Sequence, residues 1–170
     1  MFQGFVNLAD PLVLADLTHD STGSVVDLDV PPTYRVYGPD GLLAGGTGTL
    51  GYRDSGPVTG ATNASPIEIT SAAHGLTTGT LVSLAGVGGN PGANGTFTIT
   101  VTGANTFTLN GSSGGGAYTA GGSWHVTGLY AVTLVCSAAA GYEAGVTYCV
   151  LVQGVKGAAE YGQLHTFTVT

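Results

Sequence analysis

The chain has 170 residues, of which 30 are glycine and only 8% are charged, and its formal net charge is −7. Its three cationic side chains cannot form the basic surface that nucleic acid or anionic lipid requires, so we expect neither a nucleic-acid nor a membrane partner. Low charge together with a mean hydropathy of +0.31 also argues against intrinsic disorder.

The first ten residues lack the features of a secretion signal. Residues 1–10 contain no cationic region and no long apolar run, so no signal peptide is expected. The longest apolar runs further along the chain are far shorter than the ~20 residues of a membrane helix.

Short segments rich in Val, Thr, Ile, Leu and Tyr, separated by glycine clusters, predict strands along the whole chain. The predicted strands are 12–17, 24–28, 33–37, 46–51, 67–70, 81–84, 95–101, 106–110, 123–126, 129–136, 147–153 and 164–169. The residues 38–41, Gly-Pro-Asp-Gly, predict the turn of a hairpin, and 137–144 predict one helical turn or a loop. No segment keeps a helical period, so the fold class is all-β.

The two cysteines lie in what the pattern predicts as successive strands. Cys136 and Cys149 would form a disulfide if those strands pair with both side chains on one face. The alternative, which we favour, is two thiols that act as small hydrophobic side chains.

The composition changes abruptly in the middle of the chain. Residues 61–125 contain one carboxylate, Glu68, and neither Lys nor Arg, and the tripeptide Val-Thr-Gly stands on both sides, at 58–60 and 126–128. We therefore predict an outer domain, 1–60 and 126–170, interrupted by an inserted module, 61–125. A loop tip is the place where such insertions are tolerated.

Each part is similar to a known family. The segments AHGLTTGTLVSLAGV (73–87), NGTFTITV (94–101) and NTFTL (105–109) resemble the small β-barrel module named after the first catalytic-cysteine half-domain of ubiquitin-activating enzymes, which recurs in structural proteins of tailed phages. The segments PTYRVYG (32–38), GLYAVTL (128–134) and AGVTY (144–148) resemble an immunoglobulin-like β-sandwich of tailed-phage virion proteins. The resemblance implies an immunoglobulin-like antiparallel β-sandwich with an inserted small β-barrel, located in the virion.

Several segments are candidates for contacts with partners. The apolar side chains Phe2, Phe5, Val6 and Leu8 form a candidate docking arm, and the alternative for this segment is an extra strand of the sandwich. Trp124, at the end of the module, is a candidate anchor between the module and the outer domain. The glycine-rich segment 111–122 is expected to be too flexible to order alone and to order against a partner.

Residues that would carry chemistry are few. None of the four histidines has the spacing of a metal site, His74 is expected to bond locally, and His19-Asp20 lacks a nucleophilic serine in a Gly-x-Ser-x-Gly turn. The early carboxylates predict a solvated acidic edge rather than a calcium site; they are Asp10, Asp16, Asp20, Asp27 and Asp29. We therefore expect no catalytic residue, no metal, no cofactor and no enzymatic activity.

Six aromatic side chains fit either of two roles. A sugar-stacking platform is one, and packing in the core and at its rim is the other, which we favour. The residues are Tyr118, Trp124, Tyr130, Tyr142, Tyr148 and Tyr161.

The predicted function follows from the resemblance and from the scarcity of charge, because charged residues are depleted in the cores of protein interfaces. It is a structural virion protein, a capsid decoration or a neck or tail accessory, with other virion proteins as partners and a tendency to form homo-oligomers. The alternative is a module on the virion that binds host-surface carbohydrate. A glycan-degrading enzyme is disfavoured, because such enzymes need paired carboxylates in a cleft.

Overall fold

The computed structural model describes residues 3–6, 11–20 and 22–170, and it confirms the predicted all-β class. Its only helices within these residues are two short 3-10 turns, η1 (Pro91–Ala93) and η2 (Ala138–Ala140). No helix in the described part of the chain is long and apolar enough to cross a membrane. The chain divides into two compact units, Met1–Arg53 with Gly128–Thr170, and Asp54–Thr127.

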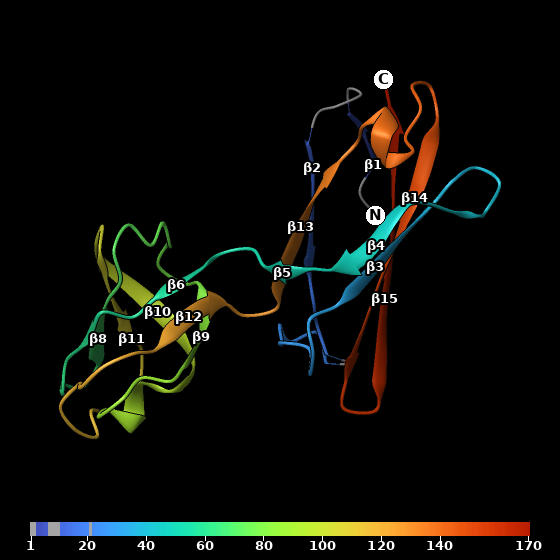
Figure 1. The fold of residues 1–170 in the computed structure, drawn as a ribbon. Coiled ribbons are helices and arrows are strands. Elements are labelled where there is room, and N and C mark those ends of the chain that lie inside the picture. Colours follow the sequence, from blue (N-terminus) through green and yellow to red (C-terminus); the bar gives the residue numbers. More distant parts are fainter. Residues whose placement is uncertain (1–2, 7–10, 21) are drawn as a thin grey trace. The chain divides into compact units, whose positions relative to one another are not determined.

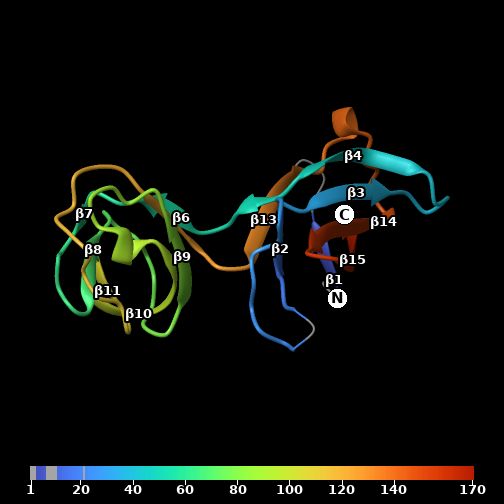
Figure 2. The same ribbon diagram turned by 90° about the horizontal axis from the view of Figure 1, so that it is seen from below.

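The first unit is a β-sandwich of two sheets (Figures 1 and 2). The larger sheet has the strand order β1 (Gln3–Val6), β15 (Ala159–Val169), β14 (Thr147–Lys156), β3 (Thr33–Tyr37) and β4 (Leu43–Thr49). The smaller sheet has the order β2 (Pro11–Leu17), β13 (Leu129–Val135) and β5 (Gly51–Tyr52). All neighbours are antiparallel except β1 and β15, which pair in parallel.

The strand order agrees with the predicted immunoglobulin-like topology. In that topology the central strands C, F and G form one sheet, and B, E and D belong to the other. Here β3, β14 and β15 correspond to strands C, F and G, and β2, β13 and β5 correspond to strands B, E and D. Apolar residues at every second position of the strands form the core between the sheets, because alternate residues of a strand point to the same face. Tyr148, Val150 and Val152 of β14 are accordingly buried.

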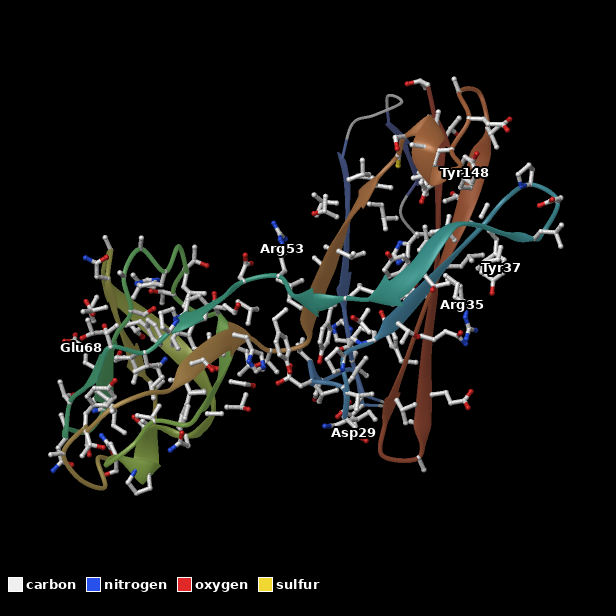
Figure 3. The ribbon with its side chains drawn as sticks, viewed as in Figure 1. Asp29, Arg35, Tyr37, Arg53, Glu68 and Tyr148 are labelled. Carbon is white, nitrogen blue, oxygen red and sulfur yellow. The ribbon has the colours of Figure 1, made fainter. Side chains whose placement is uncertain are left out.

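A hydrogen-bonded tyrosine fixes the corner before β14. The Tyr148 hydroxyl accepts a hydrogen bond from the Glu143 amide (2.9 Å) and donates one to the Gly141 carbonyl (3.5 Å). This is the tyrosine corner found near the start of strand F in immunoglobulin-like sandwiches. Figure 3 shows Tyr148 at this end of β14.

Most predicted strands are present, but the strand predicted for residues 24–28 is wrong. This segment makes a single isolated bridge, between Val25 and His19. It then crosses between the sheets. The Leu28 amide donates to the hydroxyl of Tyr130 in the smaller sheet (3.0 Å), and the Asp29 amide donates to the carbonyl of Val155 in the larger sheet (2.9 Å). This apolar segment therefore crosses between the two sheets and is not a strand of either sheet.

The turn and cysteine predictions are resolved by the pairing of strands. The hairpin at 38–41 joins β3 to β4, and Asp40 Oδ1 accepts a hydrogen bond from the Leu42 amide (2.9 Å). Both cysteines are free thiols. Cys149 lies in β14, whereas Cys136 follows β13 in the other sheet, so the strand pairing that a disulfide would require does not occur.

The second unit is a small barrel, and Figure 2 shows its strands arranged in a ring. The strand order is β6 (Ser55–Pro57), β12 (Ser123–Val126), β9 (Leu81–Ala85), β10 (Gly95–Gly103), β11 (Thr106–Leu109), β8 (Ile67–Thr70) and β7 (Gly60–Ala61). Residues 55–61 close the ring, because the Val58 amide bonds the Gly122 carbonyl and the next amide, of Thr59, bonds the Thr70 carbonyl (both 2.9 Å). Alternate residues fill the interior, among them Ile67, Ile69 and Phe107, which are fully buried.

The glycine-rich loop 111–122 is held by its own unit, contrary to the expectation that it needs a partner. The buried side chain of Asn90 accepts a hydrogen bond from the Gly115 amide and donates one to the Thr62 carbonyl (both 2.9 Å). The loops approach so closely that a Cβ at Gly92 would lie 2.1 Å from the Ser113 carbonyl oxygen. Glycine therefore permits close packing of backbone here.

The unit boundaries differ from those drawn on the sequence. The second unit begins at Asp54 and ends at Thr127, whereas the composition placed the module at 61–125. Residues 54–60 belong to the barrel because β6 pairs with β12 and residues 58 and 59 close the ring.

Candidate interaction surface

The outer face of the three-stranded sheet is an unusual surface of the first unit. Along β13, Tyr130, Val132 and Leu134 point toward the core, so the alternate positions 129, 131, 133 and 135 face outward. We call the outward positions the β2–β13 face. They are Val13, Ala15, Leu17, Gly51, Leu129, Ala131, Thr133 and Val135.

This face is apolar where an open sheet face is normally polar. The exposed fractions are 56% for Val13, 42% for Leu17 and 58% for Val135. Thr133 is the only polar residue among the eight, and none of them is charged. Scattered apolar residues on a surface need no explanation, but a contiguous apolar patch marks an interaction site.

The strand register orders the face into transverse rows. Gly51, Ala131 and Ala15 stand opposite one another on β5, β13 and β2, and together they form a row of small residues. The neighbouring row carries the larger pair Leu17 and Leu129. Because rows on one face lie about 7 Å apart, the face presents a shallow groove beside a ridge.

Among the described residues of the first unit, one charged residue borders this face. Arg53 follows β5 and lies opposite Leu129, at the end of the row of Leu17 and Leu129, where its amide donates to the Leu129 carbonyl (3.0 Å). Its side chain extends away from the ribbon (Figure 3). Near the β14–β15 turn, Lys156 forms an ion pair with Asp29 (3.4 Å). Figure 3 also shows Arg35 and Tyr37, which belong to β3 in the larger sheet rather than to the β2–β13 face.

A second, polar surface lies beside the β14–β15 turn. Two cavities of about 310 and 370 Å³ share Glu160 and Tyr161 in their linings. The first also contains Gln153 and the second contains Asp20 and Lys156. Hydrogen bonds from the Thr22 hydroxyl and from the Ser24 and Thr22 amides lower the pKa of the Asp20 carboxyl.

The predicted docking arm falls partly on a strand. Residues 3–6, which include Phe5 and Val6, form β1 at the edge of the larger sheet, next to β15. This is the alternative that the sequence left open for the segment, an additional strand of the sandwich. Phe2 and Leu8 lie outside the described residues, and the docking role of the arm stays a prediction.

Trp124 occupies a different place from the anchor that was predicted. It is buried in the core of the second unit, and its Nε1 donates to Ser71 Oγ (2.7 Å). Its ring packs nearly perpendicular to that of Phe107 (82°), with the ring centroids 6.2 Å apart. Its neighbour Gly56, on β6, also belongs to this unit. Trp124 thus acts as a core residue of the barrel, because the barrel begins earlier in the chain than the composition suggested.

Four of the six candidate platform aromatics are buried. Tyr130, Tyr142 and Tyr148 are at most 3% exposed and pack in the core of the sandwich, as Trp124 does in the barrel. Buried rings cannot stack on a sugar, so these four residues have the packing role that we favoured. Tyr118 is half-buried, and its hydroxyl bonds the Val58 and Gly121 carbonyls (both 3.1 Å).

The candidate chemical residues have structural partners. His74 Nδ1 accepts from the Leu76 amide and its Nε2 lies 3.0 Å from the Gly103 carbonyl, so both ring nitrogens bond backbone. Among the described residues, no group of His, Cys, Asp and Glu is arranged to hold a metal ion. Burial raises the pKa of the Cys136 thiol, which favours the unreactive protonated form.

No protein-family profile matches the chain, and no curated protein is significantly similar to it. The surface itself therefore carries the functional argument. Sequence reasoning missed the β2–β13 face, although a signal was present. The segments PLVLADL and LYAVTLV are apolar at most positions instead of alternating, which is typical of strands with two apolar faces.

Proposed function

We propose that the protein is a structural component of a tailed-phage virion, a capsid decoration or a neck or tail accessory, which acts through protein–protein contacts. The observation that carries the proposal is the apolar β2–β13 face, whose eight residues include no charged side chain, on an otherwise well-packed sandwich. The sequence resemblance of both units to modules of phage structural proteins supports it.

The physical reason is the cost of desolvation. Burying a charged side chain in an interface removes its hydration at a large free-energy cost, whereas burying Val, Leu or Ala has no such cost. The β2–β13 face can therefore be covered by a neighbouring protein at little cost. The barrel is similarly poor in charge. Its carboxylates are Asp54 and Glu68, and Glu68 accepts a hydrogen bond from Thr102 (2.9 Å).

The test is cryo-electron microscopy of particles purified from the lysate in which the chain is expressed. We expect regular density for the sandwich on the capsid lattice, the neck or the tail, with the β2–β13 face against another protein. Absence of the chain from purified particles would overturn the proposal.

A matched pair of variants tests the role of the face during assembly. Ala15→Lys places a charge in the centre of the face, and Thr49→Lys places the same charge on an exposed position of the larger sheet. We expect fewer copies per particle for Ala15→Lys than for Thr49→Lys, measured by quantitative mass spectrometry. Equal incorporation would show that the face does not mediate attachment.

Host-surface glycan remains the alternative ligand, and one observation favours it. The adjoining cavities beside the β14–β15 turn combine Tyr161 with the hydrogen-bonding groups of Glu160 and Gln153. An aromatic ring beside such groups suits a sugar. Glycan arrays with the purified protein distinguish this function, since a positive signal that Tyr161→Ala removes would support it.

A further inference from the structure

We infer that Asn110, with the Gly111 that follows it, is a site of spontaneous deamidation, at which the folded chain converts Asn110 to aspartate and isoaspartate. The chain contains two Asn-Gly sequences, at 94–95 and 110–111. Glycine after asparagine favours the reaction, because glycine has no side chain to shield its backbone nitrogen. The structure sets the two sequences apart, and the inference does not depend on the proposed function.

The reaction needs water and no other reactant. The backbone nitrogen of Gly111 loses its proton and attacks Cγ of Asn110, so that a new N–C bond forms, the Cγ–Nδ2 bond breaks and the side-chain nitrogen leaves as ammonia. Water then opens the resulting succinimide ring. Opening at Cγ gives aspartate, and opening at the backbone carbonyl gives isoaspartate. Overall, water is consumed, ammonia is released and a neutral amide becomes a carboxylate.

The turn that contains Asn110 leaves the reacting atoms unrestrained. Asn110 and Gly111 are its exposed central residues, and the Ser112 amide closes it by donating to the Leu109 carbonyl (3.1 Å). Gly111 has a φ of +77°, and a Cβ built on it would meet nothing within 4 Å, so there is room for the turn to move. Among the described residues, no hydrogen-bond partner holds the Gly111 amide or the Asn110 Nδ2.

The hydroxyl of Thr100, on β10, activates the amide that is attacked. It donates a hydrogen bond to Oδ1 of Asn110 (3.0 Å). Negative charge develops on this oxygen when the nitrogen of Gly111 attacks Cγ, and a hydrogen-bond donor at such an oxygen stabilises the transition state. Because a hydroxyl can rotate, it can follow the oxygen as the side chain turns toward Gly111. Thr100 therefore promotes the reaction.

Asn94 has the same following residue but the opposite setting. Its Oδ1 accepts from the Val87 amide (2.9 Å) and its Nδ2 donates to the Val87 carbonyl (3.1 Å), so the leaving nitrogen is held and the side chain is clamped to fixed backbone. Gly95 begins β10, opposite Leu84 of β9. Attack at Asn94 requires both side-chain bonds to break and the start of a strand to move. Asn94 is therefore an internal control.

The experiment incubates the full folded chain at neutral and at mildly alkaline pH, and then digests it in acid, where no further deamidation occurs. Mass spectrometry of the peptides measures aspartate and isoaspartate at both positions. We expect Asn110 to react at least about tenfold faster than Asn94, because two additional hydrogen bonds must break at Asn94. The rate at Asn110 should rise with pH, because the deprotonated nitrogen of Gly111 is the nucleophile.

Two results would overturn the inference. One is a rate at Asn94 equal to or higher than that at Asn110. The other is an unmodified Asn110 in the folded chain after a period in which a synthetic peptide of residues 107–114 has reacted completely. The chain unfolded in urea is the control for local sequence, since unfolding releases Asn94 from Val87 and the two rates should become similar. A difference that persists in urea would show that the fold does not set the rates, and would also overturn the inference.

A matched pair of variants tests the part assigned to Thr100. Thr100→Val removes the hydroxyl at nearly constant volume, and Thr98→Val makes the same change at another exposed position of β10. We expect Thr100→Val to slow deamidation of Asn110 several-fold, less than the roughly 100-fold loss for a donor in an enzyme site, because water can replace an exposed hydroxyl. Thr98→Val should react like the wild type, and circular dichroism checks that both variants are folded. A wild-type rate in Thr100→Val would overturn the role of Thr100.

Discussion

Tyr130 and Tyr142 place two phenol groups in the core of the sandwich. The Tyr130 hydroxyl accepts from the Leu28 amide (3.0 Å), and the Tyr142 hydroxyl donates to the Gly45 carbonyl (3.1 Å). Burial raises the pKa of both phenols well above the usual value near 10. The folded chain therefore keeps these two protons at a pH where the unfolded chain loses them.

The consequence is a loss of stability in alkali. The contribution of each raised pKa is complete below the unfolded value near pH 10 and disappears as pH rises toward the folded value. At about pH 11 each tyrosine should have lowered the free energy of unfolding by up to about 1.4 kcal/mol. Urea unfolding, followed by circular dichroism from about pH 8 to about pH 11, measures the slope.

Substitution separates this effect from other causes of alkaline unfolding. Tyr130→Phe leaves the Leu28 amide without its acceptor, a cost that is the same at each pH, and it should flatten the alkaline slope. Tyr142→Phe should flatten the slope as well, whereas Tyr37→Phe, on the outer side of β3, serves as the control. Wild-type slopes in both core variants would contradict the assignment.

Sequence alternation identifies many buried residues but not the partners of each one. The pattern of β14 places Tyr148 and Val150 on one face without any knowledge of the fold. The role of Trp124 required more, because its hydrogen bond to Ser71 and its contact with Phe107 join residues far apart in the chain. Local pattern carries no information on such pairs.

At the scale of elements, β1 offers a prediction about the N-terminal segment. Residues 3–6 cover the edge of β15 through parallel pairing. Deletion of residues 1–10 removes a short edge strand and its few ladder hydrogen bonds, each contributing about 0.5–1.5 kcal/mol. We expect the sandwich to remain folded, with a free energy of unfolding lower by about 1–3 kcal/mol in urea.

The same deletion tests the docking arm. If Phe2, Phe5, Val6 and Leu8 mediate attachment, occupancy on particles should fall by more than the loss of stability explains. Normal occupancy of a folded deletion variant would contradict the arm. An unfolded variant would instead contradict the prediction that β1 contributes only modestly.

Strand prediction from sequence succeeded for segments that have strand-like composition and pair in a sheet. It failed where the tertiary structure leaves such a segment unpaired. Residues 33–37, 67–70 and 123–126 are strands within the predicted limits. Residues 24–28 have the composition of a strand, yet they cross between the sheets and bond the Thr18 carbonyl and the Tyr130 hydroxyl. Composition does not distinguish a ladder from an extended crossing.

At the scale of the whole molecule, the change in composition indicated an insertion but misplaced its ends. Charge changes sharply after Asp54, yet the uncharged residues 55–60 were assigned to the outer domain. They belong to the barrel because backbone bonds of Val58 and Thr59 close it, and these bonds leave no mark on composition. Composition reflects which residues are charged and exposed, whereas the boundaries of the two units depend on backbone pairing and on which residues share a core.

The two cores consist of separate residues, which predicts that the first unit folds without the second. The core of the sandwich draws on residues 12–50 and 130–169, and that of the barrel on residues 58–124. Tyr52 stands opposite Tyr130, and the Arg53 amide bonds the Leu129 carbonyl (3.0 Å), so the two junctions already meet across an antiparallel pair. Replacement of residues 54–127 by Asn-Gly therefore leaves a short hairpin between β5 and β13.

We expect the shortened chain to unfold cooperatively in urea with strand-type circular dichroism, because a shorter connection also costs less closure entropy. Trp124 is the only tryptophan, so residues 54–127 expressed alone should carry the full tryptophan signal and report the folding of the barrel separately. If the shortened chain fails to unfold cooperatively while the isolated barrel does, the sandwich depends on the barrel for stability. Cooperative unfolding of both pieces would establish the chain as two independently stable modules, so that variants of the β2–β13 face can be studied in the sandwich alone.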